Sequence, residues 1–349
     1  MSDPWRSYRM AAAGEALREY REPLPQPQGT EVLVRVTSSG VCHSDVHFHD
    51  GYFDLGNGRK ADLARAMPLP LAMGHEIFGE VVALGPDARD AKPGDRRIVY
   101  PWIGCGACDN CKAGLEQICT GRTRIIGLNR QGGFSTHVVV PHERYLVDAG
   151  TIDEKVACTY ACSGLTAFSA LKQAGTGPLL IVGAGGVGLA AVKMASSFFG
   201  IAPFVADIDP AKREAALAEG AKQAFDPKDA DAAKQLIAAC GGATTVIDFV
   251  GAPSSTGFAM QAIRRGGRVI VVGLFGGLLE LPIATLPLRP FALQGSYVGS
   301  LAELRELVAL AQAKGAPRIP IVSRPLEAAQ QSLDDLKAGR VVGRIVLQP

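Results

Sequence analysis

The sequence predicts an α/β protein with two domains, the first rich in β-strands and the second built on a doubly wound parallel sheet. The chain has 349 residues, and this length favours two domains of roughly 150 residues each. Residues 1 to about 150 contain short β-branched segments separated by Gly, Pro and Asp clusters. From about residue 151 strand-like and helix-like segments alternate, which is typical of a parallel sheet covered by helices.

The first half is expected to form mainly short strands. Alternating patterns rich in β-branched side chains predict strands at residues 31–37, 77–84, 95–100 and 134–140. Turn-forming residues, such as those at 92–95, separate these segments. Residues 50–69 contain three glycines and are expected to form a loop with a short helical piece.

The second half is expected to alternate between strands and helices. An apolar run predicts a buried strand at Leu179–Val182, and an apolar pattern with a helical period predicts a helix at Gly186–Phe199. Further strands are expected at 204–208, 245–250, 268–273 and 291–298, with helices at 210–219 and 254–264. Proline in the first turn favours the start at residue 210. A helix at Leu301–Lys314 and a strand at 343–347 complete the chain.

The composition argues against several classes of protein. Lys and Arg number 36 against 34 Asp and Glu, a net charge of +2, so nothing favours nucleic acid or an anionic membrane as a partner. Residues 173–192 are uncharged and long enough to span a bilayer, but their glycines follow a phosphate-loop pattern. Residues 1–14 contain no apolar run typical of a secretory signal. Eight cysteines and six histidines then favour metal sites in a reducing cytoplasm.

A glycine-rich loop between the first strand and first helix of the second half predicts a dinucleotide site. Its residues are Gly183, Ala184, Gly185, Gly186, Val187 and Gly188, which fit the pattern G-x-G-x-x-G. The helix N-terminus then faces the pyrophosphate. Asp207 ends the next strand, where a carboxylate accepts hydrogen bonds from a ribose diol and repels a 2′-phosphate, so NAD is favoured over NADP. A glycine-rich turn without a ligand is the alternative.

Four cysteines in one short segment predict a structural zinc site. Their spacing is C-x2-C-x2-C-x7-C, and four thiolates from one segment close a tetrahedral shell without an open position. The residues are Cys105, Cys108, Cys111 and Cys119. A ferredoxin-type cluster is a weaker alternative, because the last gap is too long and the following proline is absent. A zinc module that reads nucleic acid is also disfavoured, because the segment has no basic patch.

Further motifs place the chain in a known family by resemblance. Residues 40–45 read GVCHSD, residues 74–76 read GHE with Gly79 downstream, and both accompany the four-cysteine segment and the glycine-rich loop. In these features the sequence resembles the zinc-containing alcohol dehydrogenases of the medium-chain dehydrogenase/reductase superfamily. The resemblance implies a GroES-like β-barrel catalytic domain at 1–151 with a zinc lobe at about 104–120. It also implies a Rossmann domain at 152–295 and a C-terminal segment, 296–349, that returns to the catalytic domain.

The resemblance also implies roles for individual residues around a second, catalytic zinc ion. Its ligands are Cys42, His75 and Cys162, which leave one position open for substrate. Asp45 orients His75, and Glu76 approaches the metal transiently. Ser44 and His47 form a proton relay.

Cofactor contacts follow from the same resemblance. His43 and Arg344 contact the pyrophosphate of NAD, and Thr166 and Val187 pack near the nicotinamide. The turn that contains Val272 and Leu274 contacts the carboxamide. Two zinc ions and NAD are therefore the expected cofactors.

The expected reaction is hydride transfer between an alcohol and NAD, giving an aldehyde or ketone. Aromatic residues such as Phe48 and Trp102, and an apparent insertion within 50–69, suggest a bulky or cyclic substrate. A polyol dehydrogenase is the main alternative, although that branch usually has a carboxylate in place of Cys162. A zinc-free reductase of the superfamily would lack both cysteine motifs. The strand at 291–298 is expected to pair across a two-fold axis in a homodimer or homotetramer.

Overall fold

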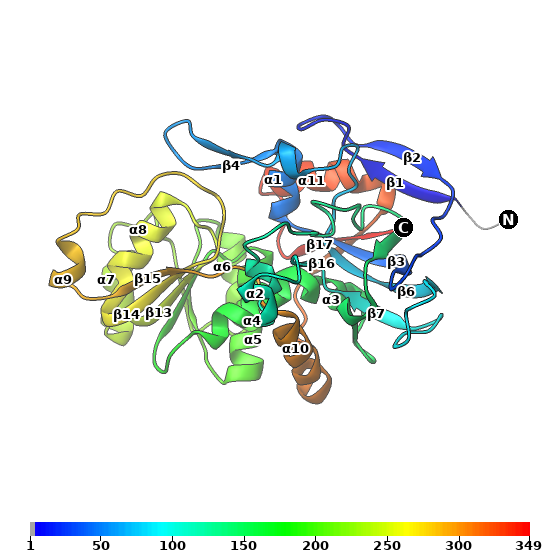
Figure 1. Ribbon diagram of the computed structural model, residues 1–349. Helices are drawn as coiled ribbons and strands as arrows, with labels where there is room; N and C mark the ends of the chain where they lie inside the picture. Colours follow the sequence, from blue (N-terminus) through cyan, green and yellow to red (C-terminus); the bar gives the residue numbers. More distant parts are fainter. Residues whose placement is uncertain (1–3) are drawn as a thin grey trace.

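The computed structural model describes residues 4–349, which form two halves, each built around one large sheet (Figure 1). Most of the N-terminal half and the C-terminus lie on one side of Figure 1, and the strands and helices of the middle of the chain lie on the other. The first three residues, part of the stretch expected to lack a secretory signal, lie outside the described residues.

The first half contains a seven-stranded sheet whose strands follow the order β16-β17-β3-β6-β7-β9, with β8 paired to β3. The C-terminal strand β17 (Arg344–Gln348) runs antiparallel to β3 and parallel to β16. The last part of the chain thus completes the sheet that the first part begins. The strands are β3 (Val32–Val41), β6 (Glu76–Leu84), β7 (Arg96–Val99), β8 (His137–Val140), β9 (Leu146–Asp148) and β16 (Ile321–Pro325).

The predicted strands of the first half are present, with different ends. The strand expected at 134–140 begins only at His137, because Phe134 donates its backbone N–H to the carbonyl of Met73 and so bonds outside the ladder. Two small hairpins accompany the sheet. They consist of β1 (Trp5–Arg9) with β2 (Arg18–Glu22), and β4 (Tyr52–Asp54) with β5 (Lys60–Asp62).

The second half contains a six-stranded parallel sheet in the order β12-β11-β10-β13-β14-β15. Numbered along this half, the order is 3-2-1-4-5-6, the arrangement of a doubly wound dinucleotide-binding fold. The predicted strands are all present, and the strand at Leu179–Val182 has the predicted bounds. The strands are β10 (Leu179–Val182), β11 (Phe204–Ala206), β12 (Gln223–Phe225), β13 (Ala243–Asp248), β14 (Ile263–Val271) and β15 (Ala292–Gly295).

Helices of the second half connect these strands. The predicted helices Gly186–Phe199 (α5) and Leu301–Lys314 (α10) have their expected bounds, and α5 ends at Gly200, whose φ of +67° suits a C-terminal cap. The strand expected at 268–273 begins earlier, at Ile263, because Ile263 pairs with Ala243 ahead of a register shift. The other helices are α6 (Pro210–Ala218), α7 (Ala232–Cys240), α8 (Pro253–Ala262) and α9 (Thr285–Leu288).

The segment 154–172 joins the two halves as one nearly continuous helical stretch. It consists of α3 (Glu154–Thr159), a π-helical turn at Tyr160–Gly164 and α4 (Leu165–Lys172). Cys162 therefore lies inside a helical stretch instead of just before a helix. Single π-turns occur often at functional sites, because the extra residue redirects neighbouring side chains.

The predicted loop at 50–69 forms a β-hairpin followed by a short 3₁₀ turn. The hairpin follows α1 (His43–Asp50) and projects at the top of Figure 1 toward the second half. Its backbone touches the segment after β14, because a Cβ on Gly276 would lie 2.4 Å from the carbonyl oxygen of Asp54. The hairpin therefore follows α1 in the first half and contacts the second half through its strand β4. The remaining helices are α2 (Asp109–Lys112) and α11 (Ala329–Lys337), with short 3₁₀ turns at Ala64–Ala66, Glu116–Ile118, Glu143–Tyr145 and Leu326–Ala328.

Among residues 4–349, no helix has both the length and the apolar character needed to cross a bilayer. The uncharged stretch at 173–192 is divided between β10 and the first half of α5.

Candidate active site

Three side chains from distant parts of the sequence meet in a buried cluster. Cys42 lies between β3 and α1, His75 directly precedes β6, and Cys162 lies on the π-helical turn. Their two sulfur atoms and an imidazole nitrogen lie within 4.8 Å of one another, and all three residues are buried. The structure thus brings together the three residues that the sequence resemblance groups around one metal ion.

One carboxylate holds two of these three positions. The Asp45 side chain is fully buried, and one of its oxygens accepts hydrogen bonds from His75 Nδ1 at 3.0 Å and from the Gly74 backbone N–H at 3.1 Å. The other oxygen accepts the Cys42 backbone N–H at 2.9 Å, which caps the first turn of α1. Asp45 thereby ties the segment that contains Cys42 to the segment that contains His75.

The free nitrogen of His75 points to a metal. With Nδ1 bonded to Asp45, the other ring nitrogen, Nε2, is buried and has no hydrogen-bond partner among the described residues. A buried unpartnered nitrogen beside two sulfur atoms is unfavourable unless an ion binds there. Two cysteines and one histidine are the ligands that zinc accepts with a fourth position left open. The cluster therefore fits a zinc ion.

The electrostatics of the cluster favour a thiolate at Cys42. A hydrogen bond from Cys162 lowers the pKa of Cys42 well below its usual value, and His75 adds to the effect against burial. Burial by itself would lower the pKa of His75, but the carboxylate of Asp45 outweighs it and holds that pKa well above its ordinary value. Both shifts favour the charged forms of these two side chains.

Glu76 and Arg344 form a buried ion pair next to the metal ligands. Glu76 follows His75 at the start of β6 and accepts the Ser163 backbone N–H at 2.9 Å, which connects it to the π-helical turn. Burial raises the pKa of Glu76, and Arg344 only partly opposes this shift. The stem of Arg344 also packs against Gly186, where a Cβ would lie 2.2 Å from Arg344 Cδ. Arg344 thus connects the metal-ligand region to the glycine-rich loop.

The expected relay residues lie on the first turns of α1. Ser44 and His47 are three residues apart, so they share one face of the helix, and both are half-buried. Burial lowers the pKa of His47, and the nearby His43 lowers it further. His43 itself is exposed, and its ring centre lies 6.3 Å from that of His47. His47 is therefore an uncharged imidazole at neutral pH.

Aromatic rings surround the metal-ligand region. The ring centre of Trp102 lies 5.3 Å from that of His75 and 5.6 Å from that of Tyr297. Trp102 is fixed by a 3.0 Å hydrogen bond from its indole N–H to the carbonyl of Ala161, beside Cys162. The sequence did not predict Tyr297 as a site residue, because it lies just after β15 and no motif includes it.

Two phenylalanines complete these surroundings. Phe48 is buried with its ring centre 5.8 Å from that of His75. Phe53, on the hairpin strand β4, lies 5.0 Å from the ring of His47. The hairpin therefore contributes an apolar ring beside the expected relay.

The glycine-rich loop has the geometry that its sequence pattern requires. Gly183 has a φ of +89°, which favours glycine. A Cβ on Gly188 would lie 1.8 Å from the carbonyl oxygen of Gly183, so only glycine lets α5 pack this close to β10. A Cβ on Gly185 would meet nothing within 4 Å, so the loop is open there. The first turn of the 14-residue helix α5 also leaves backbone N–H groups for an anion. This cradle fits the pyrophosphate of a dinucleotide.

Asp207 follows β11 beside this loop. Its carboxylate is largely buried and accepts backbone N–H groups from Ala184 at 2.7 Å and from Asp209 at 2.9 Å. The sequence had predicted the position of the acid but not its bond to the loop.

The other residues expected at the cofactor come from three parts of the chain. Thr166 is buried on α4, and Val187 is half-buried at the start of α5. Val272 is half-buried and Leu274 exposed in the segment after β14.

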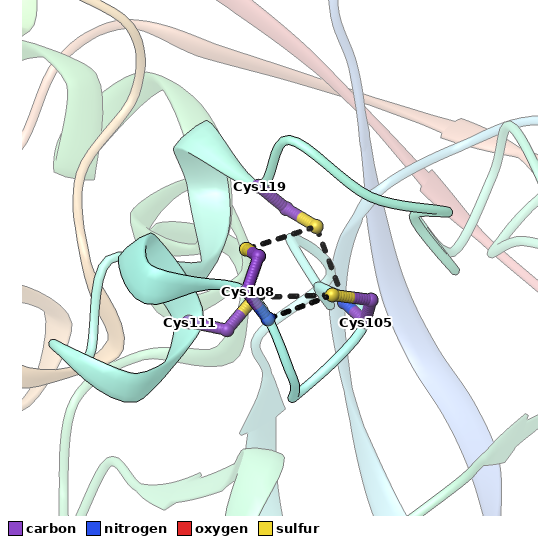
Figure 2. A group of neighbouring side chains, drawn as sticks. All are labelled: Cys105, Cys108, Cys111 and Cys119. Carbon is purple, nitrogen blue, oxygen red and sulfur yellow. Dashed lines mark hydrogen bonds between the residues drawn. The ribbon is translucent and has the colours of Figure 1, made fainter.

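The four predicted lobe cysteines point toward one another (Figure 2). Their sulfur atoms lie within 4.8 Å of one another, on a loop that includes α2 and a 3₁₀ turn. Close packing supports the cluster, because a Cβ on Gly104 would lie 2.4 Å from Cys111 Sγ. Backbone hydrogen bonds from Cys111 and Thr120 lower the pKa of Cys108 to about 5. Four sulfur donors at this spacing fit a tetrahedral zinc ion.

Glu116 anchors this lobe to the rest of the first half. Its buried carboxylate accepts the Gly104 backbone N–H and the Tyr145 hydroxyl, both at 2.9 Å, and it pairs with Arg144. No sequence motif predicts this role of Glu116. The available signal was an acid between two of the lobe cysteines, in the stretch from Leu115 to Ile118.

Comparisons with known proteins agree with this geometry. Residues 28–150 match the alcohol dehydrogenase GroES-like domain, and residues 186–313 match the zinc-binding dehydrogenase family. An NAD-dependent alcohol dehydrogenase from Sulfurisphaera tokodaii is 31% identical over 350 residues, covering 99% of this chain and 100% of the relative.

The chain belongs to the zinc-containing alcohol dehydrogenases of the medium-chain dehydrogenase/reductase superfamily. It is thus an oxidoreductase that acts on CH–OH groups of small alcohols or on the matching carbonyls, with NAD and zinc as cofactors. The expected fold class, a GroES-like domain with a Rossmann-type domain, is confirmed.

Further similarities show the range of this alcohol dehydrogenase family. The cobalt- and zinc-bound alcohol dehydrogenase structure from Pyrobaculum aerophilum has a TM-score of 0.85 and 27% identity, covering 99% of this chain and 100% of that one. A D-arabinose 1-dehydrogenase (NADP(+)) from Saccharolobus solfataricus is 30% identical over 348 residues, covering 95% of this chain and 96% of the relative.

Proposed function

We propose that Cys42, His75 and Cys162 hold the catalytic zinc of an NAD-dependent alcohol dehydrogenase. The observation that carries this proposal is the unpartnered, buried Nε2 of His75 within 4.8 Å of two cysteine sulfur atoms. A structural ion would use all its positions, whereas three ligands leave one open for a substrate oxygen. The four-cysteine lobe is proposed to hold the second, structural zinc.

When bound, zinc supplies a Lewis acid for the substrate oxygen and NAD supplies the hydride acceptor. Asp45 holds His75 in the tautomer that leaves Nε2 free for the metal. Ser44 Oγ and the His47 imidazole are proposed to take the hydroxyl proton away from the substrate. The lowered pKa of His47 keeps its ring ready to accept a proton at neutral pH. Glu76 is proposed to exchange its contact with Arg344 for a transient approach to the metal.

The cofactor is proposed to lie along the glycine-rich loop, with its ribose at Asp207. His43 and Arg344 are proposed to contact the pyrophosphate, and Thr166, Val187, Val272 and Leu274 to surround the nicotinamide. The position of Arg344 against Gly186 supports its assignment. A carboxylate at Asp207 disfavours a 2′-phosphate, so NAD is proposed over NADP.

The substrate is proposed to be a bulky or cyclic, largely apolar alcohol or ketone. Three rings support this class, because they add apolar surface around the metal-ligand region: Trp102 beside His75, Tyr297 beside Trp102, and Phe53 beside His47. Polyol oxidation remains the second candidate, and the similarity to a sugar dehydrogenase favours testing it.

The test is NADH absorbance with zinc-replete protein across short primary, long primary, cyclic secondary, benzylic and polyol substrates, with NADP in parallel. We expect turnover with NAD and the highest kcat/KM for cyclic or benzylic alcohols. Phe53→Ala is expected to lower kcat/KM for these substrates by about tenfold relative to ethanol. A preference for polyols or for NADP would contradict the assignment of the pocket or of Asp207.

The chain is also proposed to act as a symmetric dimer or tetramer in a reducing compartment. Apolar side chains from 274 to 297 are exposed in the single chain, including Phe275, Ile283 and Leu288, which are each at least 67% exposed. Exposed apolar patches of this kind mark interfaces, and β15 ends the six-stranded sheet as an unpaired edge. Sedimentation velocity tests the assembly. The six cysteines of the two clusters are free thiols without disulfides, which supports a reducing, cytoplasmic setting.

A further inference from the structure

Asp248 is a buried carboxylate at the centre of the second half. It ends β13, where it pairs with Val182 at the end of β10 and with Val271 at the end of β14. β10 leads directly into the glycine-rich loop, and β14 leads into the turn at 272–274. Asp248 therefore lies between the two segments proposed to hold the two ends of NAD, beside the point where the strand order reverses.

The side chain of Asp248 is fully buried, and four neutral donors satisfy it. One oxygen accepts the backbone N–H groups of Val250 at 2.9 Å and Gly251 at 3.1 Å. The other accepts the hydroxyls of Ser255 and Thr256, both at 2.8 Å. An ionised carboxylate has about four such acceptor positions. The carboxylate therefore fixes the loop at 248–251 onto the start of α8.

Backbone hydrogen bonds hold the turn after β14 against this loop. The carbonyl of Asp248 accepts the N–H groups of Val272 at 2.8 Å and Gly273 at 3.0 Å. Further along the chain, the carbonyl of Val250 accepts the N–H of residue 275, and the carbonyl of Gly251 accepts the N–H of residue 276, both at 3.1 Å. The two backbones are so close that a Cβ on Gly251 would lie 1.9 Å from the carbonyl oxygen of Gly273.

The same loop also packs against the glycine-rich loop. A Cβ on Gly183 would lie 2.6 Å from Val250 Cγ2, and the Phe249 N–H donates to the carbonyl of Val182 at 2.9 Å. The loop at 248–251 thus contacts the first glycine of the phosphate cradle on one side and the turn at 272–276 on the other.

We propose that Asp248 is a positioning residue that sets the place of the turn at 272–274 relative to the glycine-rich loop, so that both ends of NAD bind together. Asp248 acts through the loop that its carboxylate holds and does not touch the cofactor. The inference rests on the proposed assignment of these two segments to NAD. It predicts that weakening the carboxylate cluster affects the nicotinamide end of the cofactor more than the phosphate end.

The test compares the binding of NADH with that of ADP-ribose, which lacks the nicotinamide ring, by titration calorimetry on zinc-loaded protein. Asp248→Asn places an amide against four donors, so we expect the Kd of NADH to rise about tenfold and that of ADP-ribose less than about threefold. Thr256→Val keeps the shape but removes one donor, and we expect a smaller change in the same direction. If Asp248→Asn does not fold, the comparison of NADH with ADP-ribose binding in Thr256→Val tests the inference.

Glu143→Gln is the matched control. Glu143 is also a buried carboxylate bonded to a backbone N–H, that of Arg89 at 2.8 Å, but it lies in the first half. We expect it to leave both dissociation constants unchanged. Equal weakening of NADH and ADP-ribose by the Asp248 and Thr256 variants, or no weakening of either, would overturn the inference while leaving the proposed function intact. Wild-type protein that binds neither ligand would refute the NAD assignment and with it this inference.

Discussion

The carboxylate of Asp45 accepts a hydrogen bond from His75 Nδ1 at 3.0 Å while its second oxygen accepts the Cys42 backbone N–H at 2.9 Å. One fully buried side chain thus connects the segments that contribute two of the three proposed ligands of the catalytic zinc. Such outer partners of a metal ligand fix its orientation and tautomer. Asp45 therefore fixes the positions of these two ligand segments relative to each other.

Asp45→Asn is expected to weaken the catalytic zinc while leaving the lobe zinc in place. An amide cannot accept both the His75 and Cys42 hydrogens as the carboxylate does, and removing such a partner typically lowers metal affinity by about 10–100-fold. Dialysis against increasing chelator, followed by zinc analysis, should reduce the content from two ions to one at lower chelator than in the wild type. Equal loss of both ions would show instead that Asp45 acts on overall stability.

Two alanine variants of the glycine-rich loop are expected to separate folding from cofactor binding. Gly188→Ala places a methyl group 1.8 Å from the Gly183 carbonyl oxygen, so backbone must move, with a loss of about 1–3 kcal/mol in unfolding free energy. Gly185→Ala meets nothing within 4 Å, so the melting temperature should stay close to that of the wild type. Its methyl group would stand where the pyrophosphate approaches, and the Kd of NADH should rise about tenfold. Unchanged NADH affinity in Gly185→Ala would contradict the proposed cradle.

The rate of alcohol oxidation is expected to fall at low pH as His47 becomes protonated. Burial and His43 place the pKa of His47 below its ordinary value of 6.5, and the uncharged form, which accepts a proton, is present above that pKa. The acidic limb of kcat/KM should therefore lie below pH 6.5 in the wild type. The same shift makes the folded state less stable as the pH falls below 6.5, because the unfolded chain binds the proton more readily.

His47→Gln should remove this acidic limb and lower kcat/KM at neutral pH by about 10²-fold, the lower end of general-base effects. His49→Gln is the control, because His49 lies on the same helix but bonds to the Glu15 carbonyl at 2.9 Å, away from the relay. An acidic limb that persists in His47→Gln would assign it to another group.

Much of the fold was predictable because each element carries its own pattern. The strand Leu179–Val182 and the helix Gly186–Phe199 have their predicted bounds, since apolar runs and helical periods are local signals. The hairpin at 52–62 was not predictable. Its strands are three residues long, too short to show an alternation, and a contact with Gly276 far along the chain supports it.

The candidate site likewise combines features that a local sequence pattern reveals with features that arise only from the folded structure. The four lobe cysteines were recognisable from their spacing, because four thiolates in one short segment suit a tetrahedral ion. Cys42, His75 and Cys162 lie far apart in the sequence, and only the family resemblance grouped them. The ion pair of Glu76 with Arg344 and the donor cluster around Asp248 depend on which residues the fold brings together. Neither arrangement leaves a pattern in sequence spacing. The π-helical turn around Cys162 escaped prediction because it differs from an α-helix by a single residue.

Removal of the lobe zinc is expected to destabilise the protein without emptying the catalytic cluster. Cys111→Ser leaves three sulfur donors and a weak hydroxyl, so zinc analysis should give one ion per chain, and a lower melting temperature should follow because the lobe loses its central cross-link. Glu116 still ties Gly104 to Tyr145, so the lobe keeps one attachment to the sheet. Cys240→Ser changes a cysteine outside both clusters and should alter neither zinc content nor melting temperature. Two zinc ions retained in Cys111→Ser would show that the lobe sulfurs do not bind the metal together.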